Sequence, residues 1–84
     1  MTKAQKWTYD DCKIEAEYIA SVNALSPGAA FNNDPKCFAR YCNMQANQMR
    51  HSGFHLMALD ILQYRDIAEP NYRTNNPGDH PLFR

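Results

Sequence analysis

Two cysteines and two histidines follow one another in an order that suggests a zinc site. Cys37, Cys42, His51 and His55 spell C-x4-C-x8-H-x3-H along the chain. A zinc finger with these ligands needs a gap of about twelve residues and a β-hairpin that carries the thiols. Cys37 and Cys42 instead belong to a helical pattern, in which five residues turn the chain by about 140°. We therefore favour thiols that pack as small apolar groups, with a zinc site as the alternative.

The usual catalytic motifs are missing from the sequence. It contains no G-x-S-x-G, no H-E-x-x-H and, with 3 glycines, little material for a phosphate-binding loop. Cys42 and His51 are candidates for a thiolate pair, but a cysteine on an apolar helix face usually packs against its neighbours. We expect a protein that is not an enzyme and that needs no cofactor.

A second set of residues suits binding rather than catalysis. Five polar side chains recur at steps of four, three, four and three residues: Lys36, Arg40, Asn43, Asn47 and Arg50. Side chains of these types contact base edges, phosphates or proteins. The stretch 35–59 also contains three basic residues and no acidic one. We predict that this basic face contacts a partner, and a merely solvated helix face is the alternative.

Acidic residues gather in the stretch before the basic face. Residues 8–34 contain five acidic side chains and one basic one, so the charge of the chain is segregated. Four of the acids form a short cluster: Asp10, Asp11, Glu15 and Glu17. They favour the positive end of a helix that begins here, and we predict that they form a second partner-binding patch.

Length and composition limit the class of protein. The chain has 84 residues, of which 44% are hydrophobic and 21% charged, and this is typical of one folded domain over residues 1–84. Nine Lys and Arg balance nine Asp and Glu, which argues against a polycationic nucleic-acid arm and against an acidic DNA mimic. No apolar run approaches the roughly 18 residues that cross a bilayer, so we expect no membrane partner.

The first residues and the cysteine count point to the cytoplasm. Lys3 and Lys6 lead into Trp7 instead of an apolar leader segment. Three cysteines, an odd number, argue against a secreted disulfide scaffold. We therefore expect a cytoplasmic protein with reduced thiols.

A first helix is expected over residues 9–25. Thr8 and Asp11 have the spacing of a capping box, and the Ser-Pro-Gly segment at 26–28 ends the helix. Its predicted core stripe consists of Ile14, Tyr18, Val22 and Leu25, with Ile19 beside it.

A second helix is expected over residues 35–51, because Asp34 can cap it and Pro35 suits its first position. Its predicted core side consists of Phe38, Tyr41, Cys42, Gln45 and Met49, with the basic face on the other side. In the loop before it, Phe31 is expected to be tucked into the core.

A third helix is expected over residues 54–68, between a turn at Gly53 and a stop before Pro70. Its main stripe consists of Phe54, Met57, Ala58, Ile61, Leu62 and Tyr64. A second stripe, Leu56, Leu59 and Ile67, points roughly the opposite way. Either the first helix and the C-terminal arm cover this second stripe, or it is a surface for a partner or for a second copy.

Residues 70–84 indicate an extended arm, since turn formers and Pro81 oppose another helix. Tyr72, Leu82 and Phe83 are large and apolar, so we expect the arm to dock on the helices. The predicted fold is all-α: a small three-helix bundle whose last two helices form a C-terminal hairpin, followed by an extended C-terminal arm.

The stretch 38–71 resembles a single tetratricopeptide-type helix hairpin. Four residues carry the likeness, at the small, turn, packing and end positions of that repeat: Ala46, Gly53, Ala58 and Pro70. Met49 replaces an aromatic residue, and Arg65 takes a usual alanine position. The resemblance implies two closely packed antiparallel helices and, because it occurs once, no repeat protein.

These features favour stoichiometric binding of a larger protein partner without catalysis. In its general look the chain is similar to small accessory proteins of phages and mobile elements, and this similarity implies an inhibitor of a host defence or nuclease complex. The alternative is a helix-turn-helix-like regulator that binds nucleic acid with its basic face. A monomer has few cationic contacts and would bind nucleic acid weakly. This alternative therefore requires a homodimer.

Overall fold

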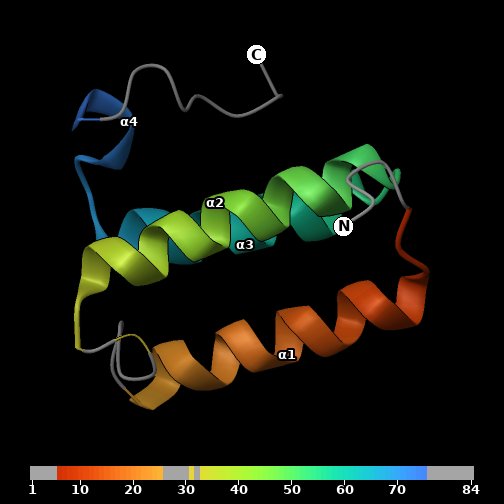
Figure 1. Cartoon of the computed structure of the whole chain (residues 1–84), viewed down its shortest axis with the longest axis horizontal. Helices are drawn as coiled ribbons and strands as arrows, with labels where there is room; N and C mark the ends of the chain where they lie inside the picture. The colour runs from red at the N-terminus through yellow and green to blue at the C-terminus, as the bar shows by residue number, and fades with distance from the viewer. Residues whose placement is uncertain (1–5, 26–30, 32, 76–84) are drawn as a thin grey trace.

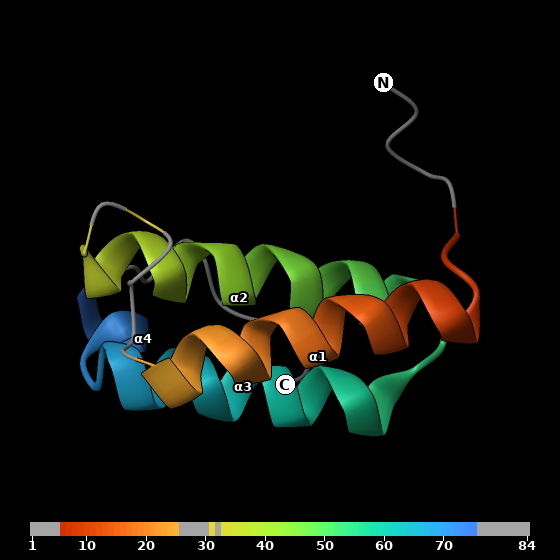
Figure 2. The same cartoon turned by 90° about the horizontal axis from the view of Figure 1, so that it is seen from below.

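The computed structural model of the chain describes residues 6–25, 31 and 33–75. Over these residues the chain is helical and has no strand. Its elements are α1 (Tyr9–Leu25), α2 (Pro35–His51), α3 (His55–Ala68) and the single-turn α4 (Tyr72–Asn75). α2 and α3 form an antiparallel hairpin (Figure 1), and α1 runs between them when seen from below (Figure 2). The predicted small all-α bundle is confirmed.

Local capping sets where α1 and α2 begin. The Thr8 N–H donates to Asp11 Oδ2 at 3.0 Å, and the Asp11 N–H donates to Thr8 Oγ1 at 3.2 Å, which is a reciprocal capping box. The Asp34 carboxylate accepts from the Lys36 N–H at 3.0 Å, with Pro35 as the first residue of α2. The predicted first residues of both helices are confirmed.

The turn between α2 and α3 depends on Gly53. This residue has a φ of +99°, a value that side chains with a Cβ rarely adopt. The Phe54 N–H then donates to the Met49 carbonyl at 2.9 Å and closes the turn. Phe54 itself is the N-cap residue, so α3 begins at His55, one residue later than predicted.

One core joins the three long helices. Its residues are Cys12, Ile19 and Val22 of α1, Phe38, Cys42, Ala46 and Met49 of α2, and Ala58, Ile61 and Leu62 of α3. Ala46 and Ala58 are fully buried, and side chains this small allow two helices to approach closely. α2 accordingly packs more extensively on α3 than on α1.

The face that α1 buries agrees with the prediction only in part, at Ile19 and Val22. Its buried residues are Cys12, Ile19 and Val22, whereas Ile14 and Leu25 are 66% and 81% exposed. At about 100° per residue, Cys12, Ile19 and Val22 fall within an arc of about 80°, and Ile14 and Leu25 lie outside that arc. The buried face is therefore rotated away from the centre of the predicted stripe.

α2 buries Phe38, Cys42 and Met49 as predicted, but its buried arc is wider, because α1 and α3 cover it from two directions. Its buried residues are Phe38, Ala39, Cys42, Asn43, Ala46 and Met49. Tyr41 and Gln45, which we predicted at the core, are half-buried at the edge of this arc. The centre of the arc therefore lies between the two covering helices.

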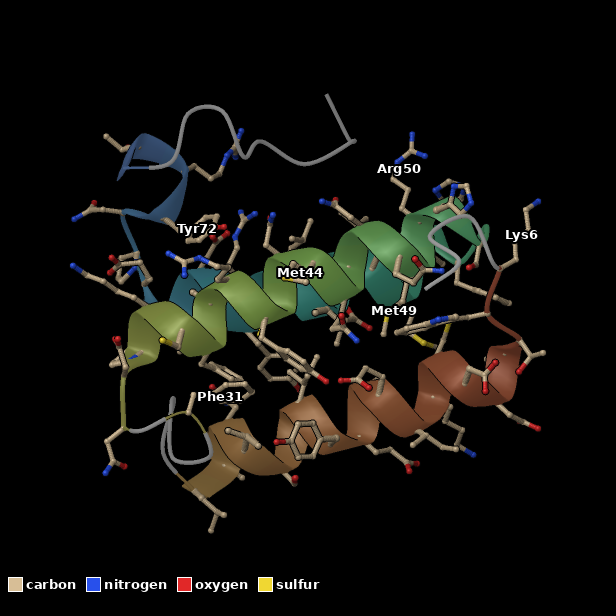
Figure 3. All side chains as sticks on the ribbon, viewed as in Figure 1. Lys6, Phe31, Met44, Met49, Arg50 and Tyr72 are labelled. Carbon is tan, nitrogen blue, oxygen red and sulfur yellow. The ribbon has the colours of Figure 1, made fainter. Side chains whose placement is uncertain are left out.

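Phe31 closes the core at one end, as expected. It lies between the start of α2 and the end of α1 (Figure 3). Its ring centroid is 5.7 Å from that of Phe38 and 5.1 Å from that of Tyr41, and both pairs are tilted. Tilted aromatic pairs of this kind add stability beyond their buried area.

The chain after α3 forms a helical turn where we predicted an extended arm. The Tyr72 N–H donates to the Glu69 carbonyl at 3.0 Å, so Pro70 occupies the second position of a turn that leads into α4. Tyr72 is buried, in agreement with the predicted docking of this side chain. Leu82 and Phe83 lie outside the described residues.

Two isoleucines on different sides of α3, one buried and one exposed, test this packing. Ile61 is fully buried and Ile67 is 60% exposed. Ile61→Ala should lower the free energy of unfolding by about 2–5 kcal/mol, because it leaves a cavity. The matched change Ile67→Ala should alter it by less than about 0.5 kcal/mol. Urea denaturation followed by far-ultraviolet circular dichroism measures both, and equal losses would show that α3 is packed differently.

Candidate interaction surfaces

The predicted basic face of α2 is not uniformly exposed. Lys36 and Arg40 are exposed, and Asn47 and Arg50 are half-buried. Asn43, in the middle of the face, is only 2% exposed. The prediction that Asn43 is available to a partner is therefore wrong, because its amide is used inside the protein.

The partner of Asn43 is a buried arginine. Arg65 of α3 is 2% exposed, and its Nη1 donates to Asn43 Oδ1 at 2.7 Å. Its Nε and Nη2 contact the half-exposed Asp66 carboxylate at 3.0 and 2.9 Å. The guanidinium also lies 5.1 Å from the ring centroid of Tyr72 in α4, as a cation–π contact. We call Asn43, Arg65, Asp66 and Tyr72 the Arg65 cluster.

The Arg65 cluster satisfies a charge that would otherwise be costly to bury. It also fastens α4 to the hairpin, because Tyr72 covers the guanidinium. Tyr72 lies at one end of the hairpin and Arg50 at the other (Figure 3). Sequence analysis did not predict the cluster, although one signal was present: Arg65 takes a position that is usually a buried alanine in the hairpin it resembles.

The four predicted acidic residues divide into two pairs. Asp11 caps α1, and Glu15 is half-buried and accepts a hydrogen bond from the Tyr41 hydroxyl. Burial and this carboxylate raise the pKa of Tyr41 well above its usual value. Asp10 and Glu17 are exposed. Two of the predicted contacts are thus tied to the fold, and two remain on the surface.

Tyr41 also links α1 to α2 through a second aromatic ring. The exposed Tyr18 meets it edge-on, with ring centroids 6.1 Å apart. Tyr18 was predicted in the core stripe of its helix, and it instead lies at the rim of the α1–α2 contact. A tyrosine suits such a partly solvated position, because its ring can pack while its hydroxyl meets water.

The second apolar stripe of α3 is exposed. Leu56, Leu59 and Ile67 are 80%, 44% and 60% exposed. Together with the exposed Gln63 we call these residues the α3 outer face. Large apolar side chains that share a helix face opposite the core are typical of a contact surface.

The α3 outer face ends beside an open pocket. The pocket has a volume of about 340 Å³ and is lined by Tyr9, Gly53, Phe54, His55, Leu56 and Met57. The Tyr9 and Phe54 rings that form part of its wall are 6.1 Å apart. Most of the lining is apolar, so the pocket suits an aliphatic or aromatic side chain of a partner.

A second pocket, of about 350 Å³, lies near the start of α1. It is lined by Lys6, Trp7, Asp11, Ile14 and Glu15. Its two carboxylates already act in the Thr8 cap and in the bond with Tyr41. This pocket is therefore mainly a by-product of the contacts that hold α1.

The cysteines are free thiols with different surroundings. Cys42 is buried, and burial raises its pKa from 9.0 to about 12, so it is protonated at neutral pH. The hydrogen bond from Cys37 Sγ to the Asp34 carboxylate, at 3.4 Å, raises the pKa of that thiol. His51 and His55 are exposed. Among the described residues, no three His, Cys, Asp or Glu side chains are grouped to hold a metal ion.

The α2–α3 hairpin is the part of the chain that resembles a tetratricopeptide repeat. Its small residues Ala46 and Ala58 are buried and its glycine forms the turn. No protein-family model, curated protein or solved structure matches this chain. The resemblance thus concerns the geometry of the hairpin alone. In the described ranges, no helix combines the length and the apolar character that crossing a bilayer requires.

The Arg65 cluster predicts a measurable coupling between two helices. Arg65→Met keeps most of the side-chain volume but removes the donor to Asn43, so it should lower the free energy of unfolding by about 1–3 kcal/mol. Asp66→Asn should cost less than about 1 kcal/mol, because that carboxylate is half-exposed. A double-mutant cycle of Arg65→Met with Asn43→Ala, measured in urea, should give a coupling of about 0.5–3 kcal/mol. Strict additivity would contradict the Asn43–Arg65 bond.

The buried Cys42 thiol predicts a loss of stability in alkali. Its pKa is higher in the folded state than the ordinary 9.0, so the folded protein holds the proton longer than the unfolded chain does. Stability should therefore fall as pH rises above about 9, by at most about 1.4 kcal/mol per pH unit for this group. Urea midpoints at about pH 8 and about pH 10, under reducing conditions, measure the fall. The Cys42→Ala variant should lose less stability between these two pH values, and an equal loss would count against this assignment.

Proposed function

We propose that this protein is a non-catalytic module that binds another protein through the α3 outer face. The observation that carries the proposal is the exposure of Leu56, Leu59 and Ile67 on the side of α3 opposite the core. Their exposed apolar surface is continuous with an open apolar pocket at Leu56. Binding through such a surface releases water from apolar groups, which is the main driving force of association.

Exposed charged residues on α1 and α2 supply selectivity rather than most of the affinity. Lys36 and Arg40 are exposed on α2, and Asp10 and Glu17 are exposed on α1. Of the two predicted charged patches, these four side chains are exposed and are not used in capping a helix. They are suited to steering an approaching partner and to excluding wrong ones.

In its specific form, the proposal is that the module occupies one surface of a larger protein and blocks it. An inhibitor of a host defence or nuclease complex, of the kind carried by phages and mobile elements, acts in this way. We place the activity in the cytoplasm, where three free thiols remain reduced. The protonated state of the buried Cys42 thiol and the exposure of both helix-end histidines support a role without catalysis.

Nucleic-acid binding by a dimer is the less supported alternative. The basic face retains Lys36 and Arg40 as exposed cations, but Asn43 is bonded to Arg65 inside the protein. An amide in that position is not available to pair with a base edge. Two exposed cations on one helix give a weak and strongly salt-dependent contact with phosphates.

Capture of the partner from a lysate of the source cells, with tagged variants, tests the proposal. The double variant Leu56→Asp, Ile67→Asp should recover at most about a tenth of the partner recovered by the unchanged protein. Ile14→Asp is the matched control, since Ile14 is 66% exposed on α1 and should leave recovery intact. Circular dichroism checks that all variants fold.

A different pattern of recovery among the variants would place the binding site on α2. If Lys36→Glu with Arg40→Glu abolishes recovery while the α3 variants retain it, the partner binds the basic face of α2. In that case the α3 outer face is not the binding surface, and the proposal is wrong in its location.

A further inference from the structure

The charged side chains that α3 exposes are both carboxylates. α3 contains three charged residues apart from its first histidine: Asp60, Arg65 and Asp66. Arg65 points into the core, where it is 2% exposed, so the exposed charge on α3 is carried by carboxylates. Asp60 is exposed, and its carboxylate has no hydrogen bond or ion pair within the part of the chain that the structure describes.

The two carboxylates border the apolar strip on both sides. At about 100° per residue, Leu59, Gln63, Leu56 and Ile67 fall within an arc of roughly 80°. Asp66 lies just beyond one edge of that arc and Asp60 just beyond the other. The α3 outer face is therefore a narrow apolar seam, about 16 Å long between Leu56 and Ile67. The Asp60 carboxylate borders it on one side, and the half-exposed Asp66 carboxylate, which is paired with Arg65, borders it on the other.

This arrangement is unfavourable for three classes of occupant. A second copy of the chain, paired antiparallel so that Leu56 of each copy meets Ile67 of the other, places the Asp60 carboxylates of both copies close to the same crossing point. Like charges at such a contact are destabilising. Nucleic acids and anionic lipid surfaces carry the same sign of charge as Asp60 and Asp66, so the seam repels them as well.

We infer that the occupant of the α3 outer face is an amphipathic helix of a partner protein with Lys or Arg on both flanks of its apolar stripe. The inference rests on the proposed function and specifies the chemistry of the partner. A partner helix with apolar residues at steps of three and four matches a straight seam of this width. Its basic flanks face Asp60 and Asp66, and one large apolar side chain enters the pocket beside Leu56.

Two synthetic peptides provide the test. Both have the same apolar positions and the same helix-forming length of about 18 residues, and they differ only in Lys or Glu at the flanking positions. Each is titrated into the intact, isotope-labelled protein, and the amide signals that move identify the binding face. The Lys-flanked peptide should bind roughly tenfold more tightly than the Glu-flanked one, and its effects should map to α3.

A charge reversal separates the role of Asp60 from a general preference for basic peptides. Asp60→Lys should reduce the preference for the Lys-flanked peptide to less than about threefold. Ala24→Lys is the control, because Ala24 is exposed on α1 and its replacement also adds a lysine, and it should leave the preference unchanged. Asp66 is left intact, since it also holds Arg65.

Three results would overturn the inference: equal binding of the two peptides, signal changes confined to α2, or no binding of either peptide at about 1 mM. Self-association through α3 in analytical ultracentrifugation, abolished by Leu56→Asp, would identify the second copy as the occupant instead. None of these results alone rejects protein binding through the α3 outer face. That broader proposal is decided by the capture experiment with the Leu56 and Ile67 variants.

Discussion

The close packing of α2 on α3 is the constraint on which the rest of the structure depends. Ala46 and Ala58 remove side-chain bulk where the two helices meet, and Gly53, with its positive φ, lets the chain reverse between them. Once this hairpin has formed, it offers one apolar surface, which α1 covers with Cys12, Ile19 and Val22. The side of α3 that faces away from both neighbours is left without a role in the core. Its leucines and isoleucine are exposed for this geometric reason.

Arg65 connects the interior of the hairpin with the character of its surface. Because the guanidinium is bonded to Asn43 and covered by Tyr72, the only arginine of α3 contributes nothing to the exposed charge of the helix. The same bond removes an amide from the basic face of α2. The burial of Arg65 therefore argues against nucleic-acid binding by α2. It also leaves carboxylates as the exposed charges of α3. This coupling arises because a buried charge must find partners within the protein.

Hydrogen bonds hold α1 in place where its apolar contacts are limited. The Trp7 N–H donates to Ser52 Oγ at 2.8 Å and fastens the start of α1 to the turn of the hairpin. Further along, the Tyr41 hydroxyl donates to Glu15 and joins α1 to α2. These bonds are half-shielded from water, so each is worth more than the same bond on an open surface. Two of the four acidic residues that the sequence predicted as a binding patch, Asp11 and Glu15, thus help to position α1.

The sequence by itself determined where the three long helices begin and end, to within one residue, but it did not predict α4. Capping groups, a glycine and prolines act on the backbone within a few residues, so their effect is independent of tertiary contacts. Only the tertiary structure decided which faces are buried. α1 carries apolar side chains on several sides, so periodicity does not select the face that fits the hairpin. Asn43 and Arg65 are 22 residues apart and become partners only when the hairpin closes. The sequence therefore identified the apolar stripe Leu56, Leu59 and Ile67, but it did not show which polar residues stay on the surface, because the burial of a polar group depends on a partner that lies far along the chain.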